Sequence, residues 1–280
     1  MAEHSIRNIR FGIGDEAYSS WDEAAASSSG YDSRLISDLA LAGALAVKRG
    51  DAVFERDTVL FHSPAHRWQL LACISAVAAS NAGRVHVLDV GGSFASVYLQ
   101  HLSFFKNYLG LRWSVVEQPH IVALGREHLQ DERLYFFSTV EEANAVSAAD
   151  LIVFSGSFQF MVEPYAMLER AARTRCTHIV IDRITLSPGP EDRITVFRVD
   201  PSIYPGSYPQ WVLSERKVLG HLSDNLGFFE TARYVDGIDG GDHVGLLFER
   251  RGGVSCTSGN ARRFAIRPML ERLRRLVRPG

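Results

Sequence analysis

The chain has 280 residues, of which 46% are apolar and 22% are charged. This composition is that of a globular protein with a sizeable core, so disorder, collagen and coiled coil are excluded as descriptions of the whole chain. Thirty Lys and Arg residues stand against 32 Asp and Glu residues, which gives a formal net charge of −2. Nothing in this overall charge favours nucleic acid or anionic lipid as a partner.

Cysteine usage and hydropathy indicate where the protein works. Cys73, Cys176 and Cys256 are far apart and form no CxxC pair of the kind that zinc or redox sites use. Residues 1–10 contain no apolar signal region, and no run of about 18 apolar residues occurs. The histidines show no metal-ligand spacing. We therefore expect a cytoplasmic protein without a transmembrane segment and without a metal site.

The N-terminal quarter predicts a loop and two helices. Residues 24–30 are mostly small and predict a loop. Apolar residues recur at helical spacing over residues 32–48, which predicts an amphipathic helix. Residues 68–79 predict a second helix, and the Asn-Ala-Gly sequence at residues 81–83 ends it.

The middle of the chain alternates short apolar runs with helical segments. This alternation is typical of a parallel sheet that is covered by helices on both faces. The predicted strands are residues 85–90, 113–117, 134–137, 151–155 and 178–182. The predicted helices between them are residues 93–108, 121–130, 140–146 and 165–174.

The alternation stops after Asp182. Residues 184–211 are rich in Pro, Gly, Ser and Tyr and predict an insertion over the sheet. Ser214 can cap a helix that runs to about His221, and residues 228–234 and 244–250 then predict two strands joined by a glycine-rich turn. A hairpin after five parallel strands is typical of class I methyltransferases, whereas a dinucleotide-binding dehydrogenase would continue with parallel strands.

The turn after the first parallel strand is the strongest local signal. Asp89 ends the strand, and Gly91, Gly92 and Ser93 lead into a helix. Ligands of open α/β sheets bind at the carboxyl ends of the strands, where a turn of small residues permits close approach. Ser93 and Ala95 occupy positions where the commonest methyltransferase pattern has glycine, and a GxGxxG dinucleotide fingerprint does not fit. A structural turn without a ligand remains the alternative.

Glu117 and Gln118 follow the second strand. A carboxylate at this place can accept hydrogen bonds from both hydroxyls of an adenosine ribose. Glu117 lies 28 residues after Asp89, more than the roughly 20 of dinucleotide folds. The long predicted helix at residues 93–108 accounts for the excess, and a solvated loop residue is the alternative.

Further polar and aromatic residues follow the third and fourth strands. Ser138 can contact adenine beside Phe136 and Phe137, or these two rings are simply core. Residues after the fourth strand can surround a sulfonium cation, to which aromatic faces are attracted by about 0.5–2 kcal/mol. Plain packing is an equal alternative for the two aromatic residues. This loop comprises Ser155, Gly156, Ser157, Phe158 and Phe160.

The acceptor side is predicted from the fifth strand and the insertion. Asp182 can act as a base or orient a substrate amine, and an ion pair with Arg183 or Arg193 is the alternative. Tyr204, Tyr208 and Trp211 stand in a proline-containing stretch that suits a lid, or a surface loop packed on its own aromatics.

Blocks of sequence spread along the chain resemble one enzyme family. They are residues 11–16, 18–21, 30–33, 89–93, 115–119, 154–157, 181–183 and 202–205. The chain resembles class I S-adenosylmethionine-dependent methyltransferases that are found beside surface-polysaccharide and natural-product gene clusters, a family that includes azetidine-2-carboxylate synthases. The resemblance implies a Rossmann-like α/β fold with a seven-stranded sheet of order 3-2-1-4-5-7-6 and an N-terminal helical cap.

The resemblance also implies an organisation of domains and of the site. We expect a cap over residues 1–66, an S-adenosylmethionine-binding domain over residues 67–251 with a lid insertion at residues 184–213, and a basic tail over residues 252–280. The expected cofactor contacts are Asp89, Gly91, Gly92, Ser93, Glu117, Gln118, Ser138, Ser155, Gly156, Ser157, Phe158 and Phe160. The expected acceptor-side residues are Tyr31, Asp182, Tyr204, Tyr208 and Trp211.

The leading functional hypothesis is methyl transfer from S-adenosylmethionine to a small molecule of specialised metabolism. The near alternative is cyclisation, in which the amine of S-adenosylmethionine attacks its own γ-carbon to give azetidine-2-carboxylate and methylthioadenosine. A non-catalytic scaffold with this fold is a third hypothesis. Residues 262–280 carry seven arginines and can touch a membrane surface or a partner, or be solvated. The sequence leaves the oligomeric state open.

Overall fold

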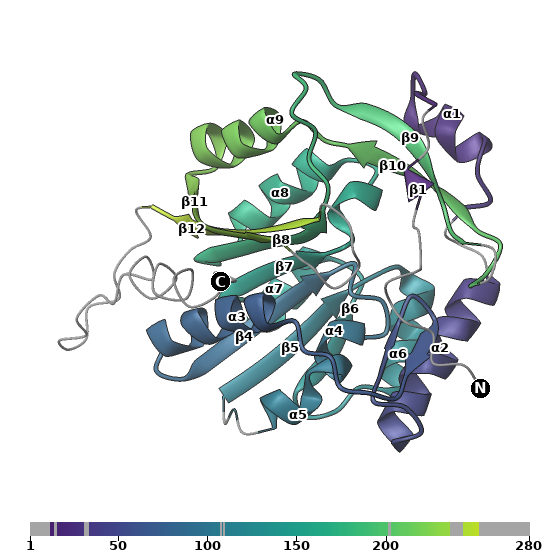
Figure 1. The fold of residues 1–280 in the computed structure, drawn as a ribbon. Helices are drawn as coiled ribbons and strands as arrows, with labels where there is room; N and C mark the ends of the chain where they lie inside the picture. Colours follow the sequence, from purple (N-terminus) through teal and green to yellow (C-terminus); the bar gives the residue numbers. More distant parts are fainter. Residues whose placement is uncertain are drawn as a thin grey trace, which may run out of the picture.

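A seven-stranded sheet forms the centre of the computed structural model (Figure 1), which describes residues 12–13, 16–30, 34–106, 108, 110–200, 203–235 and 243–251. Its strands are β4 (Arg84–Val90), β5 (Gly110–Val116), β6 (Leu134–Phe137), β7 (Leu151–Ser155), β8 (His178–Ile184), β11 (Phe228–Val235) and β12 (Val244–Arg250). They are ordered β6-β5-β4-β7-β8-β12-β11.

The direction of the strands confirms the expected fold. β4 to β8 are parallel, whereas β12 is antiparallel to both β8 and β11. Counted within this sheet alone, the order is 3-2-1-4-5-7-6. This is the expected class I methyltransferase order, with the last strand inserted beside the sixth.

Helices cover the sheet on both faces because its central strands are apolar on both sides. In β4, Val85 and Val87 belong to one buried cluster and Leu88 and Val90 to the other, as the two-residue period of a strand requires. The first face carries α3 (Trp68–Ser80), α4 (Ser96–Gln100), α5 (Leu102–Phe105) and α6 (Pro119–His128). The second carries α7 (Val140–Val146), α8 (Pro164–Arg173) and α9 (Glu215–Gly220).

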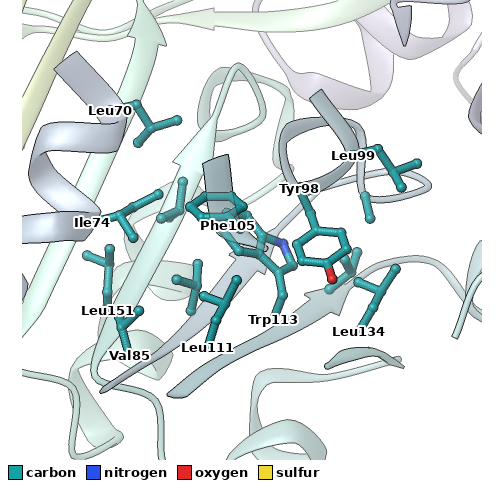
Figure 2. Packing of buried hydrophobic residues seen from close by; sticks show 14 of the residues in the cluster. Leu70, Ile74, Val85, Tyr98, Leu99, Phe105, Leu111, Trp113, Leu134 and Leu151 are labelled. Atoms are coloured by element: carbon teal, nitrogen blue, oxygen red, sulfur yellow. The ribbon is translucent and has the colours of Figure 1, made fainter. Parts of the chain in front are cut away.

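Large side chains fill the first cluster. Figure 2 shows Leu70 and Ile74 of α3 near the rings of Phe105 and Trp113, with Tyr98 beside them. The rings of Tyr98 and Phe105 lie 5.7 and 5.6 Å from that of Trp113, measured between centroids. This packing fixes the segment that follows β4 against the sheet.

The predicted helix over residues 93–108 is wrong in its bounds. Residues 91–95 form a turn, and α4 and α5 are separated at His101. His101 is completely buried, its Nδ1 is 2.8 Å from the carbonyl oxygen of Val97, and its Nε2 accepts a hydrogen bond from the backbone N–H of Arg67 at 3.0 Å. The bond to Arg67 is a tertiary contact at the break, which apolar spacing does not reveal.

The other predicted elements agree closely. β6, β7, α7 and β12 have the predicted bounds, and the remaining strands and helices of the core differ by one to three residues. The predicted helix over residues 32–48 is α2 (Arg34–Arg49). Ser214 precedes α9, but its hydroxyl donates to the carbonyl oxygen of Gly189 at 2.7 Å instead of capping the helix.

The covering segments contain structure that the sequence did not predict. α1 (Trp21–Ala26) replaces the first part of the predicted loop over residues 24–30, and Ser20 caps this helix by accepting from the N–H of Glu23. β2 (Phe54–Arg56) and β3 (Val59–Phe61) form a hairpin whose turn residues, Asp57 and Thr58, are left-handed.

The insertion after β8 also forms strands. β9 (Arg193–Arg198) and β10 (Ser207–Val212) pair with each other, and β9 pairs with β1 (Gly12–Ile13). In Figure 1, α1 and β1 (purple) lie beside β9 and β10 (green). The N-terminal segment and the insertion are thus joined into one covering layer. The predicted glycine-rich turn and the basic tail lie outside the described residues, and no described helix is long and apolar enough to cross a membrane.

Candidate ligand site

The turn after β4 adopts a conformation that suits glycine. Gly91, Ser93 and Ala95 have φ values of 75°, 51° and 64°, all in the left-handed region. Side chains with a Cβ atom lose about 1–2 kcal/mol there. The expectation that Ser93 and Ala95 occupy glycine-like positions is therefore confirmed by their backbone.

The two glycines are required by the protein's own packing. A Cβ atom on Gly91 would lie 2.5 Å from Cβ of Ser157, and one on Gly92 would lie 2.5 Å from Oδ2 of Asp89. The sequence analysis attributed these small residues to the approach of a ligand. The structure gives a different cause, since the close neighbours of both positions are side chains of the same protein.

Asp89 lies beneath this turn. It is 1% exposed, its Oδ2 accepts from Nε1 of Trp113 at 3.2 Å, and its Oδ1 is buried without a hydrogen-bond partner among the described residues. Burial raises the pKa of Asp89 to about 7. The carboxyl group packs directly against Gly92 of the turn.

Glu117 follows β5 and bridges to the turn after β4. Its Oε1 accepts from the backbone N–H of Ser93 at 3.1 Å, and its Oε2 accepts from that of Gln118 at 2.9 Å. Burial raises the pKa of Glu117. A carboxylate oxygen has two acceptor sites, so each oxygen retains capacity for a further donor.

A cavity lies at the carboxyl ends of β4 and β5, and Glu117 forms part of its wall. α2, the β2–β3 hairpin, the start of α4, the start of α6 and the insertion enclose it; α2 and α6 lie beside each other in Figure 1. Its lining residues are Ile36, Ser37, Ala40, Glu55, Asp57, Thr58, Ser93, Ser96, Glu117, Gln118, His120, Ile121 and Tyr204. Four of the predicted site residues, Ser93, Glu117, Gln118 and Tyr204, meet here.

Glu55 is a cavity residue that the sequence analysis missed. It is 3% exposed, and its carboxylate accepts from the hydroxyl of Ser96 and from the N–H of Thr58 at 3.3 Å. Burial raises the pKa of Glu55 to about 7. A three-residue strand has too little periodicity to predict, so no local signal marked this glutamate.

Asp182 lies in a closed polar network. Its Oδ2 accepts from Nη2 of Arg67 at 2.5 Å and from the hydroxyl of Ser155 at 2.9 Å, and its Oδ1 accepts from the hydroxyl of Tyr234 at 2.8 Å. Arg67 also donates to the hydroxyl of Ser155 at 2.7 Å. Both ions are buried, with side chains 3% and 0% exposed.

Asp182 forms an ion pair, but not with Arg183 or Arg193 as predicted. The partner is Arg67, which precedes α3, whereas Arg183 pairs with Asp57 at 3.4 Å. Arg67 and Tyr234 lie 115 and 52 residues from Asp182 in sequence. Spacing along the chain therefore could not reveal them.

The loop after β7 is held mainly by the core. The hydroxyl of Ser157 donates to the carbonyl oxygen of Val90 at 2.5 Å, and Gly156 is left-handed with φ 71°. Phe158 is completely buried, and its ring centroid lies 5.3 Å from that of Phe154. Packing alone therefore explains Phe158. The ring of Phe160 instead meets Phe197 of β9, with centroids 5.5 Å apart.

The predicted lid residues separate into two groups. Tyr204 and Tyr208 are hydrogen-bonded to each other through their hydroxyls and share an apolar cluster with Ile36. Trp211 instead stacks on Trp21 of α1 at 6.0 Å and donates to the carbonyl oxygen of Met161 at 3.1 Å. Trp211 is not a lining residue of the cavity.

Two further predictions concern residues outside the cavity. The N–H of Ser138 donates to Glu142 at 3.0 Å, next to the Thr139 cap of α7, and Ser138 does not line the cavity. Tyr31 lies outside the described residues. Within the described ranges, no group of three or more His, Cys, Asp or Glu residues is placed to hold a metal ion.

Comparisons with known proteins give similarity to solved structures only. No protein-family model matches the chain, and no curated protein matches it. The 1,6-didemethyltoxoflavin-N1-methyltransferase of Burkholderia thailandensis, solved with 1,6-didemethyltoxoflavin and S-adenosylhomocysteine, is 15% identical with a TM-score of 0.43, covering 87% of this chain and 96% of that chain. An O-methyltransferase family protein of Burkholderia thailandensis is 14% identical with a TM-score of 0.48, covering 80% and 62%. CalS10, an amino pentose methyltransferase of Micromonospora echinaspora solved with S-adenosylmethionine, is 12% identical with a TM-score of 0.42, covering 66% and 92%.

Proposed function

We propose that the protein binds S-adenosylmethionine and transfers its methyl group to a small-molecule acceptor. The observation that carries this proposal is the place of Glu117. It stands at the carboxyl end of β5, is bonded to the turn after the neighbouring strand β4, and lines a cavity there. Ligands of open α/β sheets bind at this edge.

The residues present fit such a ligand. The two oxygens of Glu117 retain acceptor capacity, which suits the two hydroxyls of a ribose. Glu55, Asp57 and Glu117 place carboxyl groups around the cavity, which suits a ligand that carries positive charge. When bound, S-adenosylmethionine supplies an electrophilic methyl group.

The chain's own residues would act mainly by alignment, because methyl transfer is an in-line displacement. Glu117 and the N–H of Ser93 fix the nucleoside end at the turn. Tyr204, held by Tyr208, limits the access of water from the side of the insertion. Asp182 is completely buried, does not line the cavity and is bonded to Arg67, Ser155 and Tyr234, so we propose that it holds these side chains in place and does not act as a base.

We extend this proposal to the organisation of the chain. Residues 1–66 and the insertion at residues 184–213 would form the acceptor side over a cofactor-binding core at residues 67–251. The pairing of β1 with β9, and the bond from the N–H of Gly30 to the carbonyl oxygen of Ser207 at 3.1 Å, support a joint cover. From the sequence resemblance we further propose an acceptor from specialised metabolism and a cytoplasmic location.

Incubation of the protein with S-adenosylmethionine alone tests the reaction. Simple methyl transfer predicts that no methylthioadenosine forms without an acceptor. Methylthioadenosine together with azetidine-2-carboxylate would show cyclisation instead. If millimolar S-adenosylhomocysteine fails to bind in calorimetry, the non-catalytic scaffold is the better account.

A further inference from the structure

Glu55 is a buried carboxyl group in the wall of the cavity, and the alignment role of Glu117 does not use it. Its oxygens accept from the hydroxyl of Ser96 at the start of α4 and from the N–H of Thr58 in its own hairpin. The left-handed turn at Asp57 and Thr58 brings this N–H back toward the carboxylate. Two elements therefore hold the group in place at the cavity.

α2 is built to leave room for this side chain. A Cβ atom on Gly43 would lie 3.3 Å from Cγ of Glu55, a distance tighter than almost all real contacts of that kind. α2 therefore lies against Glu55 through a glycine. Ser37 and Ala40 of the same helix line the cavity beside it. The close packing keeps the carboxyl group almost entirely away from bulk water.

Two carboxyl groups in the cavity wall, those of Glu55 and Glu117, are left for a ligand, because that of Asp57 is paired with Arg183 at 3.4 Å. The cavity lining includes the carboxyl groups of Glu55, Asp57 and Glu117 together with His120, and no Lys or Arg is among the described lining residues. Arg56 directly follows Glu55 on β2, and its positive charge lowers the pKa of Glu55. At the contacts with Glu55, α2 presents Gly43 and α4 presents Ser96, neither of which can ionise.

We propose that Glu55 is a second ligand-binding carboxylate of this cavity and that it selects a positively charged group of the bound ligand. The inference rests on the proposed function, because it assumes that the cavity takes S-adenosylmethionine. Glu55, on the β2–β3 hairpin, recognises the charge of the ligand, whereas Glu117 binds its ribose.

The electrostatics of the site give this proposal a measurable consequence. Burial raises the pKa of Glu55 to about 7, so at neutral pH the group is about half protonated. A cation placed beside it favours the ionised form. Binding of a cationic ligand therefore releases protons from Glu55, whereas binding of a neutral one does not.

Calorimetric titration at pH 7 in two buffers of different ionisation enthalpy measures this release. The probes are S-adenosylmethionine, which carries the sulfonium charge, and adenosine, which is neutral. The wild-type protein should release up to about half a proton more with S-adenosylmethionine than with adenosine, because both probes carry the ribose that Glu117 binds and only the first carries the charge. Glu55→Gln should abolish this difference and weaken S-adenosylmethionine about tenfold, the effect of a one-unit pKa shift, with adenosine affinity unchanged.

Two further variants keep the test decisive. Glu127→Gln is the matched control, because its side chain on α6 is 68% exposed and does not line the cavity, and it should retain the proton release. Ser96→Ala removes a hydrogen bond that lowers the pKa of Glu55, so it should increase the release, and it serves if Glu55→Gln does not fold.

The outcomes separate the two proposals. Equal proton release, or an equal ratio of S-adenosylmethionine to adenosine affinity, in wild type and Glu55→Gln would overturn the role of Glu55 alone. If the wild-type protein binds neither probe, the proposed function fails and this inference fails with it.

Discussion

Two carboxylates at the same edge of the sheet behave differently. Asp182, near the end of β8, is completely buried and accepts from three side chains. Glu117, just after β5, is held by two backbone N–H groups and faces a cavity. Asp182 is enclosed by side chains of the protein, whereas Glu117 has acceptor capacity that faces the cavity. An acid at the end of a strand therefore indicates a ligand site only where a cavity adjoins it.

The closed site joins four parts of the chain. Arg67 precedes α3, Ser155 ends β7, Asp182 lies in β8 and Tyr234 comes from β11. Tyr234 reaches Asp182 across β12 at its register partner, Gly245, where a Cβ atom would lie 2.0 Å from Cζ of the ring. The network thus fixes the antiparallel hairpin to the parallel part of the sheet.

Breaking the closed site should have the largest effect. Arg67→Met leaves the carboxylate of Asp182 buried without its cation, which costs about 3–5 kcal/mol in free energy of unfolding. Denaturant unfolding measures this loss. Arg183→Met is the control, because its partner Asp57 is 40% exposed and such a pair contributes about 0–1 kcal/mol. Equal losses in both variants would show that the buried network is not what stabilises this edge.

The open site should instead make stability fall as pH rises. Folding raises the pKa of Glu55 from its ordinary 4.5 to about 7, so the folded state holds a proton that the unfolded chain releases between these values. The contribution of Glu55 to the free energy of unfolding is therefore complete below about pH 4.5. It is lost as pH rises to about 7, a change of up to about 3 kcal/mol.

Urea unfolding of wild type and Glu55→Gln across this pH range measures the contribution. Asp89 adds a change of the same sign in both proteins, because burial also raises its pKa to about 7. The difference between the two proteins therefore reports Glu55, and Glu127→Gln, whose side chain is 68% exposed on α6, should keep the wild-type slope. A slope that Glu55→Gln leaves unaltered would contradict the placement of a buried acid in the cavity wall.

The crossing of Tyr234 over Gly245 can be tested by adding one methyl group. Gly245→Ala forces the ring of Tyr234 to move, and such overpacking costs about 1–3 kcal/mol of unfolding free energy. Gly227→Ala is not a suitable control, because Gly227 has a positive φ. Tyr234→Phe is more informative, since it removes only the bond to Asp182. If Gly245→Ala is neutral by thermal unfolding, the ring does not cross β12 at this place.

The turn that carries the open site should tolerate glycine better than its own residue. Ser93 is left-handed, so Ser93→Gly should stabilise the protein by about 0.5–1 kcal/mol while keeping its N–H bond to Glu117. Ser103→Gly in α5 should have the opposite sign, because glycine is unfavourable inside a helix. Thermal unfolding shows whether each variant is more or less stable than wild type. If Ser93→Gly is not stabilised, the backbone at Ser93 is not strained.

The sequence predicted the elements whose signal is local. β6 is a continuous apolar run, β7 is one up to Ser155, and β12 has the apolar run Leu246–Phe248 at its centre; the bounds of all three agree with the prediction. Glu117 and Ser93 were both predicted as cofactor contacts because they follow strands at one edge of the expected sheet, and the structure joins them by a hydrogen bond. The β2–β3 hairpin was missed, since three-residue strands carry no period, and Glu55 was missed with it. Arg67 was missed because only tertiary folding brings it to Asp182.

Calorimetric titration with S-adenosylhomocysteine tests the central claim most directly, on wild type, Glu117→Ala and Glu127→Ala. Glu127 lies on α6 with a side chain 68% exposed, so its removal should leave affinity unchanged. Loss of hydrogen bonds to a carboxylate costs about 1.5–3 kcal/mol, so Glu117→Ala should bind at least about tenfold more weakly. Wild-type affinity in Glu117→Ala would contradict the assignment of this cavity to the nucleoside.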